Sequence, residues 1–247
     1  MSCPDQITYA IRQGDNLYQL SRHYGTTVQA LLALNPNVDP YNLILGSELL
    51  ICPGEGFTQG PNPPACPNPA LQFSLLGGMR KAWEQHVYWT RLFLVSAAAR
   101  LRDLDATTAR LMQNPRDIAG VFAPYYGADT VRTIERLLTE HLQIGGALIT
   151  ALRDGQTAQA EALTRGWYGN ADKMADAFDA LGPFYQREEV RRMLYTHLDL
   201  TTQEVKARLA GDFAADIAAF DRAEQEALRM ADYFSSGILR QFPQKFR

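Results

Sequence analysis

Long hydrophobic runs and a strong net charge are both missing from this sequence of 247 residues. No apolar stretch approaches the roughly 20 residues that a transmembrane helix needs, so we expect no membrane span. Lysine and arginine total 24 against 27 acidic residues, and they form no basic stripe. Nucleic acid is therefore a poor candidate partner. Residues 1–5 carry neither the basic nor the apolar region of a secretory signal, so none is expected.

Familiar catalytic motifs are also scarce. The sequence has no ExxH or HxxxH pair, which are the helical signatures of ferritin-like and zinc-protease sites. It shows neither the paired carboxylates of a lysozyme-type hydrolase nor the Cys/His arrangement of a wall peptidase. Glu84, Glu140 and Glu204 fall on polar helix faces and are expected to be solvated. These absences leave open whether the protein is an enzyme.

The N-terminal stretch, residues 7–53, predicts a strand, two short helices and a second strand. Asp15 follows a glycine in a turn dipeptide and is placed to cap the first helix. Thr27 is placed to cap the second helix, which Pro36 cannot continue. The last strand is expected at residues 48–52, antiparallel to the first. This arrangement is a small α+β module with the order βααβ.

This pattern closely resembles the LysM module. The resemblance covers residues 7–53 and nearly every signature position of the family. The matching residues are Tyr9, Ile11, Gly14, Asp15, Leu17, Tyr24, Gly25, Val28, Leu31, Asn35, Pro36, Leu45, Gly46, Leu49, Ile51 and Pro53.

The resemblance implies binding of peptidoglycan or chitin, the glycans that contain N-acetylglucosamine. In the family, the ligand lies in a shallow groove between the first strand–helix loop and the loop before the last strand. Asn16 departs from the usual Thr or Ser but is still small and polar. An alternative is that the leucines and Gly14 only build the module. Carried over to this sequence, the glycan-binding residues are Gly14, Asp15, Asn16, Leu17, Asn42, Leu43 and Ile44.

Only three cysteines are present, Cys3, Cys52 and Cys66. Cys3 lies just before the first expected strand and Cys52 ends the last. Antiparallel pairing would bring these two together, so a Cys3–Cys52 disulfide is one prediction. The alternative is two small buried thiols in a reducing compartment. Cys66 has no expected partner.

The composition changes twice along the chain, which predicts three parts. Residues 1–53 form the LysM-like module. Residues 54–70 are dominated by Pro, Gly and Asn without periodicity, as in a linker. Residues 71–247 show helical spacing throughout, and short connections predict an all-α bundle of antiparallel neighbours. Six helices are expected there, at residues 72–102, 105–123, 128–153, 157–181, 187–209 and 212–239.

An internal repeat organises the helical part. The segment around His141 aligns with the segment around His197 at a constant offset of 197 − 141 = 56, and His86 fits more loosely. The six helices therefore predict three helical hairpins, each with one histidine on its first helix. Because the neighbours of each histidine are apolar, all three should point inward, where an imidazole needs a partner.

Three inward histidines suggest a metal site. Asp172 and Asp232 stand at matching places on two of the second helices, and imidazole plus carboxylate suits zinc, iron, manganese or nickel. The alternative is that the repeat copies one hydrogen-bonded core histidine three times without a metal. In that case Asn114 and Asn170 would simply be helix caps.

Two functions of different class follow from these patterns. One is a non-enzymatic protein of the bacterial cell envelope or spore coat, whose helical part serves assembly, a protein partner or metal binding. The other is a metal-dependent enzyme that the LysM-like module delivers to the cell wall. The lack of a recognisable signal makes synthesis in the cytoplasm part of either prediction.

Overall fold

The computed structural model divides the chain into two compact units, which are described separately. Residues 1–71 and 243–247 form the first unit, and residues 72–242 form the second. Within the described residues, no helix combines the length and the apolar character that crossing a bilayer requires. The structure describes residues 3, 6–12, 14–40, 43–54 and 68–247.

The N-terminal unit contains a two-stranded antiparallel sheet and two short helices, which confirms the predicted βααβ order. The strands pair from Ile7 opposite Ile51 to Ala10 opposite Glu48. Alternate strand residues face a small core that both helices cover. The elements are β1 (Ile7–Ala10), α1 (Leu17–His23), α2 (Val28–Leu34) and β2 (Glu48–Ile51). The core consists of Tyr9, Ile11, Leu17, Leu20, Tyr24, Leu31, Leu49 and Ile51.

Side-chain caps define where these two helices begin. Thr27 caps α2 as predicted, because its hydroxyl accepts a hydrogen bond from the Ala30 amide at 3.1 Å. The cap of α1 is Asn16, which accepts from the Gln19 amide at 2.8 Å. The prediction that Asp15 caps this helix is therefore wrong. The Asp15 carboxylate is used elsewhere, as described below.

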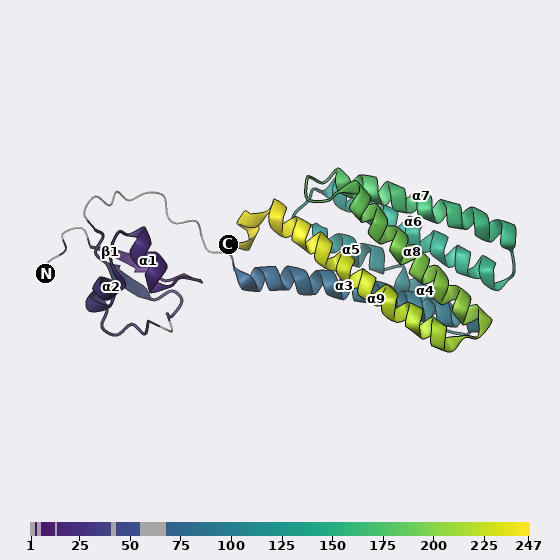
Figure 1. Ribbon diagram of the computed structural model, residues 1–247, viewed down its shortest axis with the longest axis horizontal. Coiled ribbons are helices and arrows are strands. Elements are labelled where there is room, and N and C mark those ends of the chain that lie inside the picture. The colour runs from purple at the N-terminus through teal and green to yellow at the C-terminus, as the bar shows by residue number, and fades with distance from the viewer. Residues whose placement is uncertain (1–2, 4–5, 13, 41–42, 55–67) are drawn as a thin grey trace. The chain divides into compact units, whose positions relative to one another are not determined.

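The second unit is an all-α bundle of three hairpins, as predicted (Figure 1). The hairpins are α3 with α4 and α5, then α6 with α7, and then α8 with α9. Figure 1 shows α3 and α9 side by side, where Arg80 and Asp232 form an ion pair. The helices are α3 (Pro69–Ala99), α4 (Leu104–Leu111), α5 (Asn114–Phe122), α6 (Ala128–Arg153), α7 (Thr157–Asp179), α8 (Arg187–Ala210) and α9 (Phe213–Gln241). The 3-10 helix η1 (Pro243–Phe246) follows α9 in the chain and belongs to the first unit.

One predicted helix, residues 105–123, is two helices in the structure. Helix α4 ends at Leu111, and α5 begins at Asn114 with Pro115 in its first turn. Proline has no amide hydrogen, and its ring clashes with the carbonyl four residues earlier, which here is that of Leu111. A continuous helix is therefore excluded at this point, while the first turn of a new helix tolerates proline.

The three histidines occupy a middle layer of the bundle core, between two apolar clusters. Along α3, Trp83 precedes His86 by one turn and Phe93 follows it by two turns. Phe93 belongs to one cluster and Trp83 to the other. The Phe93 cluster also contains Leu94, Ala97, Leu111, Leu142, Ile149 and Val205. The Trp83 ring stacks on that of Phe234, which in turn contacts the rings of Phe122 and Phe178.

Candidate functional site

Three buried histidines from three different helices converge in the bundle. His86 lies on α3, His141 on α6 and His197 on α8. Their ring centroids are 5.5 Å apart for His86 and His197, 6.0 Å for His141 and His197, and 6.2 Å for His86 and His141. Each ring offers one nitrogen to a common centre, and these nitrogens all lie within 4.8 Å of one another. This is the geometry of a possible metal centre.

An asparagine orients the first histidine. The Asn114 side-chain amide nitrogen donates to the Ala82 carbonyl at 2.9 Å, which turns its oxygen toward His86. That oxygen lies 2.9 Å from His86 Nδ1 and accepts its proton. Nδ1 therefore carries the hydrogen, and Nε2 is the nitrogen with a free lone pair.

The second histidine has the same arrangement. Asn170 donates to the Leu137 carbonyl at 3.1 Å, and its oxygen lies 3.3 Å from His141 Nδ1. In both hairpins the amide nitrogen is bound to the carbonyl four residues before the histidine. Asn170 lies in the middle of α7, so it is not a helix cap. Sequence reasoning missed this role. The signal was that an asparagine follows each of these two histidines at nearly the same distance, 28 residues after His86 and 29 after His141.

The third hairpin departs from this pattern. His197 Nδ1 is buried and has no hydrogen-bond partner among the described residues. The residue that matches Asn170 at the repeat offset is Glu226, since 226 − 170 = 56. Glu226 is buried, but its carboxylate forms an ion pair with Arg229 at 3.1 Å. Among the described residues, no hydrogen bond to Nδ1 therefore fixes the orientation of the His197 ring.

The three imidazoles are uncharged at neutral pH. Burial lowers the pKa of His86 to about 4. Burial, together with nearby His86, lowers the pKa of His141 to about 3, and burial holds the pKa of His197 well below its ordinary value. Neutral imidazole is the form that coordinates a metal ion.

The spacing of the three nitrogens fits a metal after a small inward movement. Zinc–nitrogen bonds of about 2.0–2.1 Å at tetrahedral angles place three nitrogens about 3.3–3.4 Å apart. The observed limit is 4.8 Å, so each ring would move inward by somewhat less than about 1 Å on binding. His197, whose ring nitrogen has no fixed partner, is the ligand best able to move.

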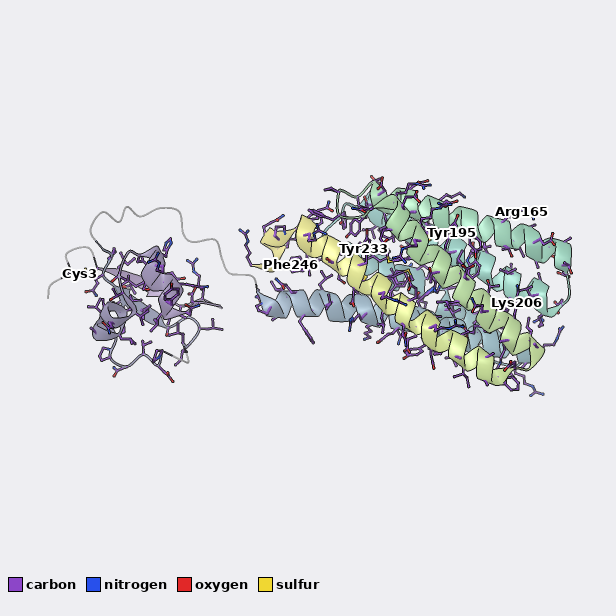
Figure 2. The ribbon with its side chains drawn as sticks, in the orientation of Figure 1. Cys3, Arg165, Tyr195, Lys206, Tyr233 and Phe246 are labelled. Carbon is purple, nitrogen blue, oxygen red and sulfur yellow. A yellow bond between two sulfur atoms is a disulfide. The ribbon has the colours of Figure 1, made fainter. Side chains whose placement is uncertain are left out.

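The two predicted carboxylate ligands do not join the histidines. Asp172 accepts hydrogen bonds from Arg191 at 2.9 Å and from Tyr195 at 3.0 Å, and Figure 2 shows this tyrosine on α8. Asp232 pairs with Arg80 at 2.6 Å, and both side chains are well exposed. We therefore correct the predicted ligand set to the three histidines alone. The two aspartates instead form ion pairs between neighbouring helices at the surface.

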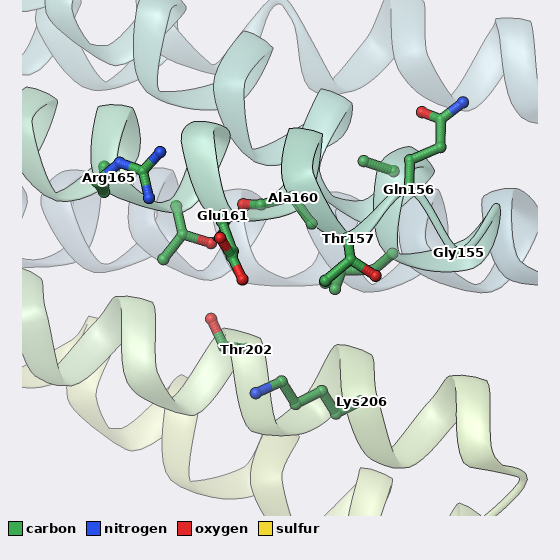
Figure 3. A pocket seen from close by; sticks show the side chains of 11 residues that line it. Gly155, Gln156, Thr157, Ala160, Glu161, Arg165, Thr202 and Lys206 are labelled. Carbon is green, nitrogen blue, oxygen red and sulfur yellow. Dashed lines mark hydrogen bonds between the residues drawn. The ribbon is translucent and has the colours of Figure 1, made fainter.

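A separate hollow of about 420 Å³ lies on the bundle surface, between the start of α7 and helix α8 (Figure 3). Glu161 from α7 and Lys206 from α8 both line it. Among the described residues that form its wall there is no histidine. This hollow is therefore distinct from the histidine centre.

In the N-terminal unit, backbone hydrogen bonds bring the two predicted glycan-binding loops together. The Ile11 amide donates to the Ser47 carbonyl at 2.9 Å, and the Gly46 amide donates to the Ile11 carbonyl at 2.8 Å. The chain after β1 and the chain before β2 therefore leave the same end of the sheet. For this reason the loop after β1 and the loop before β2, which the resemblance predicts to bind the glycan, begin next to each other.

The first of these loops has a partly structural role. Asp15 accepts hydrogen bonds from the Tyr9 hydroxyl at 2.8 Å and from the Arg12 amide at 2.7 Å. Burial and this carboxylate together raise the pKa of Tyr9 to about 12. Gly14 is exposed with a φ of 87°, a backbone angle that favours glycine. Leu17 is buried in the core, so its side chain offers a glycan almost no surface.

The second loop presents apolar surface. Ile44 is 69% exposed and Leu45 is 60% exposed, whereas Leu43 packs partly against the core. Tyr18, at the start of α1, is exposed as well. Sequence reasoning did not name the exposed Leu45 and Tyr18 as candidate contact residues. Asn42 lies outside the described residues.

Comparison with known families decides the identity of this unit. Residues 9–51 match the family model of the LysM domain. Residues 9–51 are a LysM domain. No curated protein and no solved structure matches the chain. The LysM assignment supports glycan binding of the peptidoglycan or chitin type in general.

The LysM domain is closed by a disulfide between Cys3 and Cys52, with Cα atoms 5.9 Å apart (Figure 2). We expect the double substitution Cys3→Ser, Cys52→Ser to lower the stability of this domain by about 4 kcal/mol, because the bond closes a loop of roughly 50 residues. Chemical denaturation of the full chain, followed through the LysM tyrosines, would measure the change. A double variant as stable as the wild type would show that the bond contributes nothing.

Proposed function

We propose that this protein attaches to N-acetylglucosamine polymers through its LysM domain and carries one divalent metal ion in its helical bundle. The convergence of His86, His141 and His197 is the observation that supports the metal half of the proposal. The LysM family match supports the glycan half. On the same ground we propose a location in the bacterial cell envelope or spore coat.

The donor set narrows the choice of metal. Three neutral imidazoles without a carboxylate suit zinc, iron or nickel better than manganese, which prefers oxygen ligands. Asn114 and Asn170 hold two of these imidazoles by their Nδ1 hydrogens, as outer partners of metal-bound histidines do. The metal would be held by Nε2 of His86 and His141 and by a ring nitrogen of His197. We propose zinc as the first candidate.

The glycan half predicts that the full chain sediments with insoluble peptidoglycan or chitin but not with cellulose, which lacks the N-acetyl groups. One shallow groove should give a dissociation constant on the order of tens of micromolar to millimolar. Ile44→Ser should weaken binding about 5- to 30-fold by removing apolar contact from the groove.

Ile217→Ser is the matched control, since Ile217 is an exposed isoleucine on α9. It should leave binding unchanged. Equal sedimentation with cellulose, or equal loss in both isoleucine variants, would contradict binding in the predicted groove.

The metal half is tested by measuring how many zinc ions each chain retains. After equilibrium dialysis against buffered zinc, the wild-type chain should retain one ion, and His86→Gln should retain none at the same free concentration. Elemental analysis gives the ratio. Retention of the same amount by His86→Gln would show that the zinc binds elsewhere.

A further inference from the structure

A small cavity adjoins the three histidines. Its volume is about 20 Å³, and Thr90, Phe93 and Thr201 line it together with His86, His141 and His197. A cavity needs roughly 10–15 Å³ to hold one water molecule. The space beside the histidine nitrogens therefore suits one small molecule or ion of a few atoms.

The wall of this cavity repeats with the hairpins. One helical turn after each histidine stands Thr90 on α3, Gly145 on α6 and Thr201 on α8, and all three line the cavity. The Thr201 hydroxyl donates to the His197 carbonyl at 2.9 Å. At Gly145 an added Cβ would lie 3.1 Å from the Trp167 ring, so only glycine fits without a shift there.

Thr90 differs from Thr201 in having no partner. Its hydroxyl oxygen is buried and makes no hydrogen bond within the described parts of the chain. A buried hydroxyl without a partner costs about 1–3 kcal/mol. Its position on the wall beside the histidines makes a bound ligand the natural partner.

Charge balance indicates what that ligand is. A divalent ion held by three neutral imidazoles keeps its full charge of +2 in a buried layer of the core. Among the described residues, the histidine cluster contains no carboxylate. The two predicted carboxylates, Asp172 and Asp232, pair with arginines at the surface instead. An uncompensated buried charge is costly, so an anionic fourth ligand is favoured over a neutral one.

A larger hollow offers a route to this position. An outer pocket of about 440 Å³ shares Phe93, Leu111, Leu142 and Gly146 with the inner cavity. The Phe93 ring lies against Gly146, where an added Cβ would be 3.3 Å from the ring. This ring therefore forms part of the wall that the two spaces share.

We propose that the metal centre binds one small anion, hydroxide or an ion of azide size, as its fourth ligand, and that the Thr90 hydroxyl donates a hydrogen bond to it. This inference rests on the metal centre of the proposed function. Three protein ligands with one open position are the arrangement of catalytic rather than structural zinc sites. Thr90 is a positioning residue for the bound anion in this account.

The test uses the full chain loaded with cobalt(II), whose visible absorption reports its ligands. Azide should change the absorption with saturation at one ion per metal. Thr90→Val, which has nearly the same shape, should bind azide about 10- to 100-fold more weakly, because it lacks the charge-assisted hydrogen bond. Thr90→Ser keeps the hydroxyl and should bind azide as the wild type does.

The possible failures are distinguishable. Cobalt bound at one ion per chain with an absorption that azide does not change would overturn this inference and leave the metal centre standing. Equal azide affinity in Thr90→Val and the wild type would overturn the role of Thr90. If no cobalt is retained at all, the metal half of the proposed function fails and this inference fails with it, whereas the glycan half is unaffected.

Discussion

Replacing Arg91 with methionine should lower the free energy of unfolding of the helical bundle by about 3–5 kcal/mol. Arg91 on α3 donates to Glu204 at 2.8 Å and to Asp216 at 2.9 Å. The Asp216 side chain is fully buried and that of Glu204 is 4% exposed. Arg208 also contacts Asp216, at 3.1 Å, but forms no hydrogen bond to Glu204 among the bonds described.

The stability that Arg91→Met loses should depend on pH. Burial, against the opposing effect of Arg91, raises the pKa of Glu204 from 4.5 to about 7. Without Arg91 this pKa rises further, so the folded state holds a proton that the unfolded state releases as pH rises above 4.5. Stability is therefore lost with rising pH, and the penalty should be larger at about pH 8 than at about pH 5.

Thermal unfolding of Arg91→Met, followed by helical circular dichroism, should show a decrease of about 10 °C or more. Arg132→Met is the matched control, because Arg132 and its partner Asp129 are both highly exposed. Its effect should stay within about 0.5 kcal/mol. If both variants lose the same stability, the buried ion cluster does not hold the bundle together.

Saturating zinc should raise the unfolding temperature of the bundle by about 10 °C. An ion that binds only the folded state adds about 4 kcal/mol at a free concentration 1,000-fold above its dissociation constant. For a unit of this size, each kcal/mol shifts the midpoint by about 2–4 °C. A chelator should reverse the shift.

His141→Gln should abolish this shift, since a glutamine cannot replace an imidazole between two other ligands. His23→Gln is the matched control, because His23 belongs to the LysM domain and not to the cluster. The melting curve without metal shows whether each variant still folds. A zinc shift of the same size in His141→Gln would place the ion elsewhere.

The LysM domain was predictable from sequence because local signals carry most of its fold. Thr27 and the positions of the core residues depend on neighbours a few residues away. Asp15 shows the limit of such signals. Asp15 and Asn16 are both good helix caps, and only the contact of Asp15 with Tyr9 across the loop decides between them.

The repeat correctly predicted that the histidines converge. It did not correctly predict that the two aspartates join them. Asp172 lies two residues after buried Asn170, and two residues turn a helix by about 200°. Its side chain therefore leaves on the opposite face. The same holds for Asp232, which lies between buried Met230 and Phe234.

The prediction that Glu204 is solvated failed for the opposite reason. It follows His197 by seven residues, which is nearly two full turns, so both side chains lie on the same inward face. Its expected solvation is wrong, since the side chain is buried. Only tertiary structure supplies Arg91, the partner from α3 that makes this burial tolerable.

X-ray absorption at the metal edge of the zinc-loaded full chain tests the central claim most directly. The account predicts three imidazole nitrogens and one further nitrogen or oxygen donor, all at about 2.0–2.1 Å from the zinc. In His86→Gln loaded at a higher zinc concentration, the outer-shell scattering typical of imidazole should decrease by about a third, since two of the three imidazoles remain. A shell of oxygen atoms alone, a sulfur ligand, or a spectrum that His86→Gln leaves unchanged would contradict a metal centre at the three histidines.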